Sequence, residues 1–414
     1  MLSKPKIIFV GDYSREDYVK LLEASKDYCE FYFLYYTSPN EEKSNFYKSY
    51  GYAIYWKNFT SAQQLLQKIC PSKVVFLYIE SYNHVVLNLA CKSFNIPTYQ
   101  LEHGLRADYV VGFDPKFSPS LPVPYIQRLK SKARLLLQIS SKIKSRLFLL
   151  NSIKLLPKEA ADFAREFILV RKKHNFLETS RRVASYKRIP QIYISFSHNI
   201  FKIHQKEENL PINTKVHFIG VPYFDHLAKI KEAEEIKAVL FIDQPLAEQS
   251  LLGWTKELKH SFSKQLVTIC NALGYTLLVK LHPVQDKAGW AALSQNHDLK
   301  LISDSDIDWY APRVRIVFGF YSTYLLPFAA LKHITLLTYE KHPVGKLMVS
   351  KPFTDAGVAY PIFNLEDLYN VLSGSCKIHR DQLSFKAKFT EDWLYRFDGN
   401  SGARLRDILL SQDN

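Results

Sequence analysis

The sequence predicts an α/β protein with two Rossmann-like domains. Segments with the apolar, β-branched composition of strands alternate with segments of helical periodicity along nearly the whole chain, an order typical of parallel sheets. The chain has 414 residues, too many for one ordinary core and suited to two domains of about 150–200 residues each. The alternation is interrupted near residues 225–236 by a charged stretch. We therefore expect two domains whose carboxyl sheet edges line a central cleft.

The first domain is expected at residues 1–228. Its strand candidates are 6–12, 30–37, 73–80, 96–102, 191–197 and 216–221. Helical periodicity is found at 14–25, 62–70 and 83–94, and it continues through a long basic region from 126 to 183. We interpret this region, about 124–185, as a basic helical insertion.

The second domain is expected at residues 229–384. Its strand candidates are 237–243, 275–281, 299–302, 315–320 and 333–338, and its helix candidates are 256–273, 322–331 and 365–372. The final segment, 385–414, is predicted to be helical and to pack back on the first domain.

The bulk composition is that of a globular chain, with 47% apolar and 14% aromatic residues. Five cysteines are scattered without a CxxC motif: Cys29, Cys70, Cys91, Cys270 and Cys376. This pattern argues against a disulfide framework or a zinc site and favours a reducing cytoplasm. Neither a signal peptide nor an apolar run of about 18 residues is visible in the sequence. We expect a cytoplasmic protein, with a peripheral place at the inner face of the cytoplasmic membrane as a further expectation.

The formal net charge is +15, and the excess is concentrated. No acidic residue occurs from Lys116 to Lys158, a stretch that contains Arg128, Lys130, Lys132, Arg134, Lys142, Lys144, Arg146 and Lys154 between apolar residues. A basic, apolar-rich helix of this kind can lie on an anionic membrane or hold a lipid-linked substrate. We favour this reading for Arg128–Arg146 over an ordinary solvated helix face. Nucleic acid is the least favoured partner, because no nucleic-acid-binding module is recognisable.

Several common signatures are missing: GxGxxG, GxxxxGK[ST], GxSxG and HExxH. Their absence weakens the dinucleotide, P-loop, hydrolase and zinc-protease alternatives. Asp304, Asp306 and Asp308 form a DxDxD run after a short strand. We interpret them as helix-capping and solvated loop acids, and we predict no metal site.

The most informative motif of the first half is Glu102-His103-Gly104, which directly follows an apolar strand. Gly104 allows a tight turn at the carboxyl end of that strand, which would place Glu102 and His103 at the ligand-binding edge of the sheet. A carboxylate beside an imidazole suits general-base catalysis. Asp108 is a further candidate for the same role or for substrate contact.

The second half offers a receptor for phosphate at two strand ends. His282-Pro283 follows one apolar strand, and a hydroxyl pair at the start of a helix follows another. An imidazole and a hydroxyl-capped helix terminus are suitable phosphate ligands. The predicted phosphate-binding residues are His282, Pro283, Gly319, Tyr321, Ser322 and Thr323, with Asp243, Gln244 and Lys280 as candidate substrate contacts.

These motifs resemble those of GT-B-fold glycosyltransferases of bacterial surface polysaccharides, especially the inverting sialyl-, polysialyl- and Kdo-transferases that use CMP-activated sugars. Such enzymes have an acidic motif ending in Gly in the first domain. An HP motif and then a Ser/Thr pair follow in the second domain. Glu102-His103-Gly104, His282-Pro283 and Ser322-Thr323 match in order and approximate spacing. One departure is that this chain has one acid before Gly104 where sialyl- and polysialyltransferases have two.

The resemblance implies inverting transfer of an acidic sugar from a CMP donor to a cell-surface glycan or lipid-linked acceptor, without a cofactor. The base would be Glu102, His103 or Asp108, and His282 with Ser322-Thr323 would stabilise the leaving phosphate. Residues 220–225 also resemble the linker of related enzymes, including the UDP-GlcNAc 2-epimerase group. A UDP or CDP donor, an epimerase-like enzyme and a non-catalytic scaffold subunit of a polysaccharide assembly complex therefore stay open as alternatives.

Overall fold

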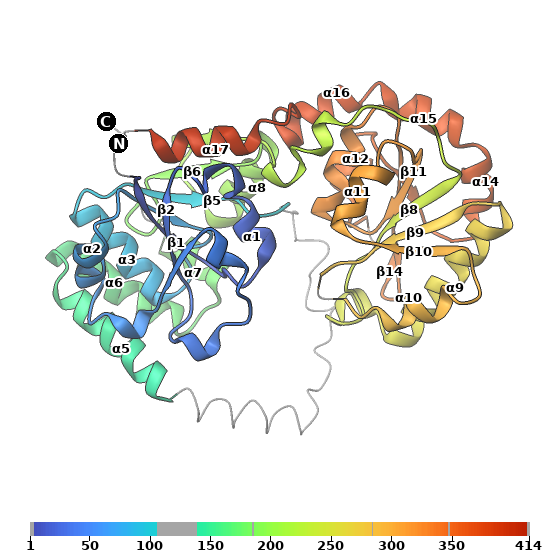
Figure 1. Ribbon diagram of the computed structural model, residues 1–414. Helices are drawn as coiled ribbons and strands as arrows, with labels where there is room; N and C mark the ends of the chain where they lie inside the picture. The colour runs from blue at the N-terminus through green and yellow to red at the C-terminus, as the bar shows by residue number, and fades with distance from the viewer. Residues whose placement is uncertain (1–3, 106–138, 184–185, 284, 347, 412–414) are drawn as a thin grey trace. The chain divides into compact units, whose positions relative to one another are not determined.

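The computed structural model describes residues 4–105, 139–183, 186–283, 285–346 and 348–411 (Figure 1). These residues form two compact units. The first contains the described residues up to Gly104, those from 139 to Tyr223 and those from Asn400 onward, and the second contains Leu105 and Phe224–Gly399. The chain thus leaves the first unit at Tyr223, slightly before the predicted boundary. The candidate Asp108 and the first part of the basic region, including Arg128 to Arg134, lie outside the described residues.

The first unit is built on a seven-stranded parallel sheet in the order β3-β2-β1-β4-β5-β6-β7. The strands are β1 (Lys6–Val10), β2 (Glu30–Leu34), β3 (Gly51–Ile54), β4 (Lys73–Phe76), β5 (Thr98–Leu101), β6 (Ile192–Ser195) and β7 (Val216–Phe218). The sequence analysis missed β3, an edge strand whose side chains are only partly buried. The central strands are buried throughout, as expected for a parallel sheet covered on both faces.

The helices of the first unit are α1 (Glu16–Lys20), α2 (Ala62–Ile69), α3 (Tyr82–Ser93), α5 (Ile139–Lys154), α6 (Lys158–Arg171), α7 (Phe176–Arg182), α8 (His198–Glu208) and α17 (Ser401–Leu410). The described part of the basic region is therefore three helices, with Pro157 preceding the second of them. The sequence analysis did not predict α8. This helix begins after Ser197, whose hydroxyl accepts the amide hydrogen of Ile200, and ends at Asn209 in the left-handed conformation.

The C-terminal helix α17 belongs to the first unit, whereas the helices just before it belong to the second. The buried Lys73 of β4 donates through Nζ to the carbonyl oxygen of Ile408, 2.9 Å away. This bond ties the last turn of the helix to the sheet.

The second unit contains a six-stranded parallel sheet in the order β10-β9-β8-β11-β12-β15. The strands are β8 (Ala238–Ile242), β9 (Thr276–Lys280), β10 (Leu299–Ile302), β11 (Ile316–Gly319), β12 (Thr335–Tyr339) and β15 (Tyr360–Ile362), and a small antiparallel pair is formed by β13 (Lys341–His342) and β14 (Gly345–Lys346). Its helices are α9 (Lys256–Ala272), α10 (Ala288–Leu293), α11 (Ile307–Tyr310), α12 (Leu326–Ala330), α13 (Lys351–Thr354), α14 (Asp367–Ser373), α15 (Ser375–Leu383) and α16 (Lys386–Phe389). The unpredicted β15 is a three-residue edge strand containing Pro361.

Each unit has its own apolar core, and the two cores are separate clusters. The predicted fold of two Rossmann-like domains is confirmed. Among the described residues, no helix is long and apolar enough to cross a membrane. All five cysteines are free thiols.

Candidate functional site

The carboxyl end of β5 carries Glu102 and His103, as predicted. The Glu102 amide still pairs with the carbonyl oxygen of Ile194 in β6, 2.8 Å away, so Glu102 continues the ladder and its side chain is only 4% exposed. Its Oε1 accepts the amide hydrogen of His103 at 3.0 Å. The His103 side chain is 24% exposed. Of the two adjacent groups, the imidazole is therefore the one that is open to solvent.

Aromatic side chains enclose the His103 ring. The ring centroid of Tyr18 lies 4.9 Å away, and that of Tyr78 lies 6.2 Å away at the end of β4. The hydroxyl of Tyr223 donates to the His103 carbonyl oxygen at 3.3 Å. Burial, together with the nearby Asp17 carboxylate, raises the pKa of Tyr223 well above its usual value, so it stays a neutral donor. Sequence reasoning missed these residues because they come from separate parts of the chain: Tyr18 from α1, Tyr78 from the end of β4 and Tyr223 from the turn after β7.

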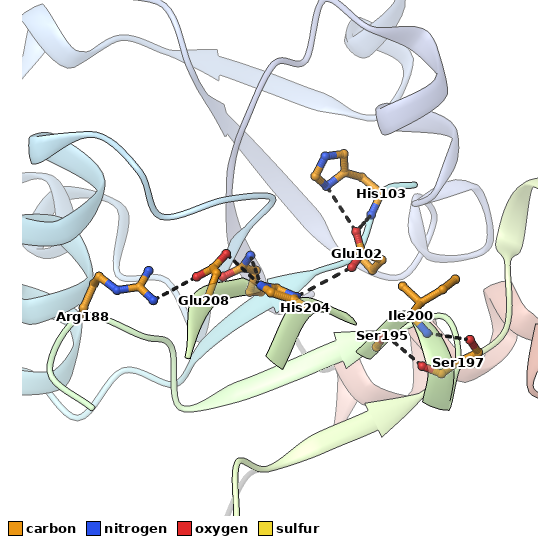
Figure 2. Close-up of polar contacts among 9 residues, drawn as sticks. Glu102, His103, Arg188, Ser195, Ser197, Ile200, His204 and Glu208 are labelled. Atoms are coloured by element: carbon orange, nitrogen blue, oxygen red, sulfur yellow. Dashed lines mark hydrogen bonds and ion pairs between the residues drawn. The ribbon is translucent and has the colours of Figure 1, made fainter. Parts of the chain in front are cut away.

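Behind Glu102 lies a buried polar chain (Figure 2). The Glu102 Oε2 atom lies 3.8 Å from Nδ1 of His204 in α8, and Nε2 of His204 lies 2.9 Å from Glu208 Oε1. Glu208 Oε2 accepts a hydrogen bond from Arg188 at 2.9 Å. The sequence analysis identified none of these three partners.

The strand ends of the second sheet are aligned as predicted. Lys280 of β9 is the register partner of Ile242 of β8, and Ile242 is the partner of Gly319 of β11. The segments that follow these strands, containing His282, Asp243 and Tyr321 to Thr323, therefore leave the same edge of the sheet. Strands in a sheet are spaced about 4.8 Å apart, so β9 and β11 are about 10 Å apart, with β8 between them.

The His282 loop is held by Gln285. The His282 amide donates to Gln285 Oε1 at 3.2 Å, and the Gln285 amide donates to the His282 carbonyl oxygen at 2.9 Å. The His282 side chain is half-buried, whereas Pro283 is exposed. Lys280 is buried and pairs with Asp304 at 3.1 Å. Its ammonium group supports this edge of the sheet rather than pointing freely to a substrate.

Asp243 is not placed to contact substrate, and that prediction needs correction. Its side chain is completely buried and forms an ion pair with Lys259 of α9. Its Oδ2 accepts hydrogen bonds from Gln285 Nε2 at 2.6 Å and from Trp290 Nε1 at 2.8 Å, and its Oδ1 accepts the amide hydrogen of Gln244 at 2.8 Å. Its acceptor sites are thus used within the protein. Gln244, next to it, remains half-exposed.

The hydroxyl pair lies at a shorter helix than predicted. Ser322 caps a three-residue 3₁₀ turn, Thr323–Leu325, and accepts the amide hydrogen of Tyr324 at 3.2 Å. Only then does the five-residue helix α12 begin, with a proline in its first turn. So short a helix provides a weak dipole, and a phosphate here would depend mainly on the half-buried hydroxyl groups of Ser322 and Thr323.

Gly319 and Tyr321 have different positions at this edge. A side chain on Gly319 would come within 2.9 Å of the carbonyl oxygen of Ile242, so glycine is needed for close strand packing rather than for ligand contact. Tyr321 is half-buried, with its ring 6.1 Å from that of Phe353.

The three aspartates of the DxDxD run have separate partners. Asp304 pairs with Lys280, and Asp308 lies 3.4 Å from His226. Asp306 forms a capping box with Ser303, as predicted for a capping residue. In the described part of the chain, no group of three or more His, Cys, Asp or Glu residues is arranged to hold a metal ion.

Comparisons with known proteins agree with this architecture. A family profile described as alpha-2,8-polysialyltransferase (POLYST) matches residues 6–341. A search of curated proteins found no significant match.

Among solved structures, the calicheamicin glycosyltransferase CalG4 is similar with a TM-score of 0.53 and 9% identity, over 99% of this chain and 98% of that one. MurG of Acinetobacter baumannii is similar with a TM-score of 0.50 and 10% identity, over 98% of this chain and 99% of that one. An H444N variant of the wall teichoic acid polymerase TagF, soaked with CDPG, is similar with a TM-score of 0.50 and 11% identity, over 98% of this chain and 88% of that one. At these identities the likeness concerns the fold.

Proposed function

Because the chain belongs to the alpha-2,8-polysialyltransferase family and is a glycosyltransferase with the GT-B fold, we propose that it is an inverting enzyme for acidic sugars. It transfers sialic acid, Kdo or a related nonulosonic acid from a CMP donor to a cell-surface glycan or lipid-linked acceptor. The observation that supports this most is the partly exposed His103, held beside the buried Glu102 at the end of β5. A reachable imidazole with a fixed backbone suits a general base.

In the proposed reaction, His103 removes the proton from the acceptor hydroxyl. The freed oxygen attacks the anomeric carbon while the bond from that carbon to the CMP phosphate oxygen breaks. His282 donates a hydrogen bond to the departing phosphate, and Ser322 and Thr323 supply further donors. Stabilising the charge that develops on the leaving group lowers the barrier to transfer. Glu102 does not itself attack, because its carboxylate is buried and turned away from solvent.

In this proposal the acceptor is presented at an anionic membrane surface, and one face of helix α5 contacts that surface. Ile143, Leu147 and Leu150 are 48–55% exposed and follow one another at i, i+4 and i+7, while the opposite face packs Phe148 and Ser152 into the unit. Exposed cations flank this apolar stripe at Lys144 and Arg146, and the sequence has no acidic residue from Lys142 to Lys158. Apolar side chains bordered by cations suit the interface of anionic lipid.

This docking is tested by sedimentation with vesicles of phosphatidylglycerol and phosphatidylcholine. Each basic residue at such a surface contributes about 1 kcal/mol, so Lys144→Glu with Arg146→Glu should weaken binding by about 30-fold or more. Lys256→Glu with Lys264→Glu, on exposed sites of α9, is the matched control and should bind like the wild type. Equal loss in both variants would show a non-specific charge effect and contradict a docking role for α5.

The donor is tested by turnover. CMP-, UDP- and CDP-activated sugars are supplied separately, with an oligosialic acid and a lipid-linked glycan as acceptors. The proposal predicts acceptor-dependent release of CMP only. Turnover with UDP or CDP sugars instead would favour the alternative donors or an epimerase-like reaction. Binding of nucleotide without turnover of any donor would favour the non-catalytic scaffold.

A further inference from the structure

His204 sits at the centre of a buried chain that begins at the Glu102 carboxylate (Figure 2). Glu102, His204, Glu208 and Arg188 are each at most 6% exposed. His204 lies between two carboxylates, 3.8 Å from Glu102 and 2.9 Å from Glu208. The chain thus links the candidate catalytic loop to the interior of the first unit.

Periodicity explains why these side chains meet. Gln100 and Glu102 are two residues apart at the end of β5, so they point to the same side of the sheet. His204 and Glu208 are four residues apart on α8, so they share one face of the helix. Gln100 Nε2 lies 3.5 Å from His204 Nε2, at the limit of a hydrogen bond. The polar side chains on one face of β5 and its end therefore lie against the polar side chains on one face of α8.

The ion pair of Arg188 and Glu208 does not by itself account for His204. A buried charge without a partner costs several kcal/mol, which explains why Arg188 and Glu208 are 2.9 Å apart. That pair would remain complete if residue 204 were apolar. His204 adds a contact to Glu208 through one ring nitrogen and, through the other, an approach to Glu102 that the ion pair alone does not provide.

The two nitrogens of the His204 ring have different partners. The Glu208 carboxylate, paired with Arg188, can only accept hydrogen bonds, so Nε2 of His204 carries a hydrogen. Nδ1 of the same ring faces Glu102, 3.8 Å from its Oε2. The ring therefore bridges Glu208 and Glu102.

We propose that His204 is a positioning residue for the transfer reaction, braced by Glu208 and Arg188. Its ring holds the Glu102 carboxylate in its orientation, and the Glu102 Oε1 in turn fixes the His103 amide at 3.0 Å. His204 touches neither donor nor acceptor and acts through Glu102. This inference rests on the proposed function in assigning His103 as the base.

The first test compares His204→Gln with His342→Gln. His342 is a buried histidine of the second unit whose ring packs on Trp254 and Phe320, so it is a control for the loss of a buried imidazole. His204→Gln should lower kcat at least tenfold, leave KM for donor and acceptor within about twofold, and unfold at a temperature similar to the control. Unchanged kcat, or a rise in KM that accounts for the loss, would overturn the inference.

A double substitution shows whether the effect passes through Glu102. If it does, adding His204→Gln to Glu102→Gln should cause no further loss of kcat, because interacting residues are not additive. Independent, additive losses would contradict the inference.

A measurement without substrate separates this inference from the proposed function. The His103 amide resonance in ¹H–¹⁵N NMR spectra should shift in His204→Gln and stay in place in His342→Gln. An unmoved resonance in both variants overturns the role of His204, even if the enzyme is active. A wild-type protein that turns over no donor refutes the proposed function, whatever the resonance does.

Discussion

The histidine loops that follow β5 and β9 are each supported by a buried charged network, but the two networks reach their loops differently. In the first unit the side chain of Glu102, a member of the loop, is itself part of the network and contacts His204. In the second unit the central carboxylate is Asp243, at the end of the neighbouring strand β8. It is linked to the His282 loop by the Gln285 side chain, whose Nε2 donates to Asp243 Oδ2 and whose Oε1 accepts the His282 amide hydrogen.

This difference indicates different tasks. The first network acts on the orientation of a carboxylate beside the proposed base, so disturbing it should change the rate of transfer. The second network fixes the shape of the His282 loop. The group that joins Asp243 to this loop is the side-chain amide of Gln285, which is uncharged. Disturbing the second network should therefore change the affinity for the donor more than the chemistry.

The largest expected effect is a difference between the His103 and His282 substitutions in what they change, the rate of transfer or the affinity for CMP. His103→Ala should reduce kcat by about 10²–10⁴-fold, as is typical for loss of a general base, with CMP affinity near wild type. His282→Ala should weaken CMP binding as well as transfer. Single-turnover rates and calorimetric titration with CMP measure the two quantities. Weakened CMP binding in His103→Ala would contradict the assignment of the two loops.

A second expected effect concerns stability in acid, and it compares a buried histidine in each unit. Burial lowers the pKa of His84 in the first unit and of His342 in the second from 6.5 to about 4. The unfolded chain then binds protons at a higher pH than the folded one, so stability is full above pH 6.5 and falls as the pH drops towards 4. Each histidine contributes up to about 3 kcal/mol to this fall.

Urea unfolding at pH 7 and pH 4 measures this effect. The His84→Gln variant should lose up to about 3 kcal/mol less than the wild type over this range. An identical loss in wild type and variant would mean that His84 is not kept neutral by burial.

The smallest effect is expected for Gln285→Ala, which removes the side-chain link between Asp243 and the His282 loop. Loss of the hydrogen bond to the His282 amide costs about 1 kcal/mol, so KM for the donor should rise about fivefold while kcat changes little. Gln265→Ala, on an exposed position of α9, is the control. A fall in kcat without a change in KM would show that the second network also acts on the chemistry.

Much of the fold follows from the sequence because buried parallel strands are continuous apolar runs, which are easy to recognise. The short edge strands β3 and β15 lack that signal. Helix α8 was missed because its sequence, His198–Glu208, is largely polar and only one face packs inward. The expected single helix at 322–331 is divided into a 3₁₀ turn and a short helix, with Pro327 in the first turn of the latter.

The location of the candidate site could be predicted from the strand ends, but the burial of its side chains could not. Glu102 and Asp243 both follow strands, and sequence position alone makes them look equally accessible. Their partners, His204 and Lys259, come from helices that later parts of the chain supply. Such long-range ion pairs leave no local pattern, and this is why Asp243 was predicted as a substrate contact.

The account depends most on Glu102 supporting a base rather than attacking the donor. A time course of the reaction with CMP-sialic acid, followed by ¹H NMR of the first product formed, tests this directly. Single displacement assisted by His103 predicts a product whose anomeric configuration is opposite to that of the donor. Retention of configuration would mean that a carboxylate such as Glu102 forms a covalent sugar intermediate, as in double displacement at glycosides, and would contradict the roles assigned to Glu102 and His103.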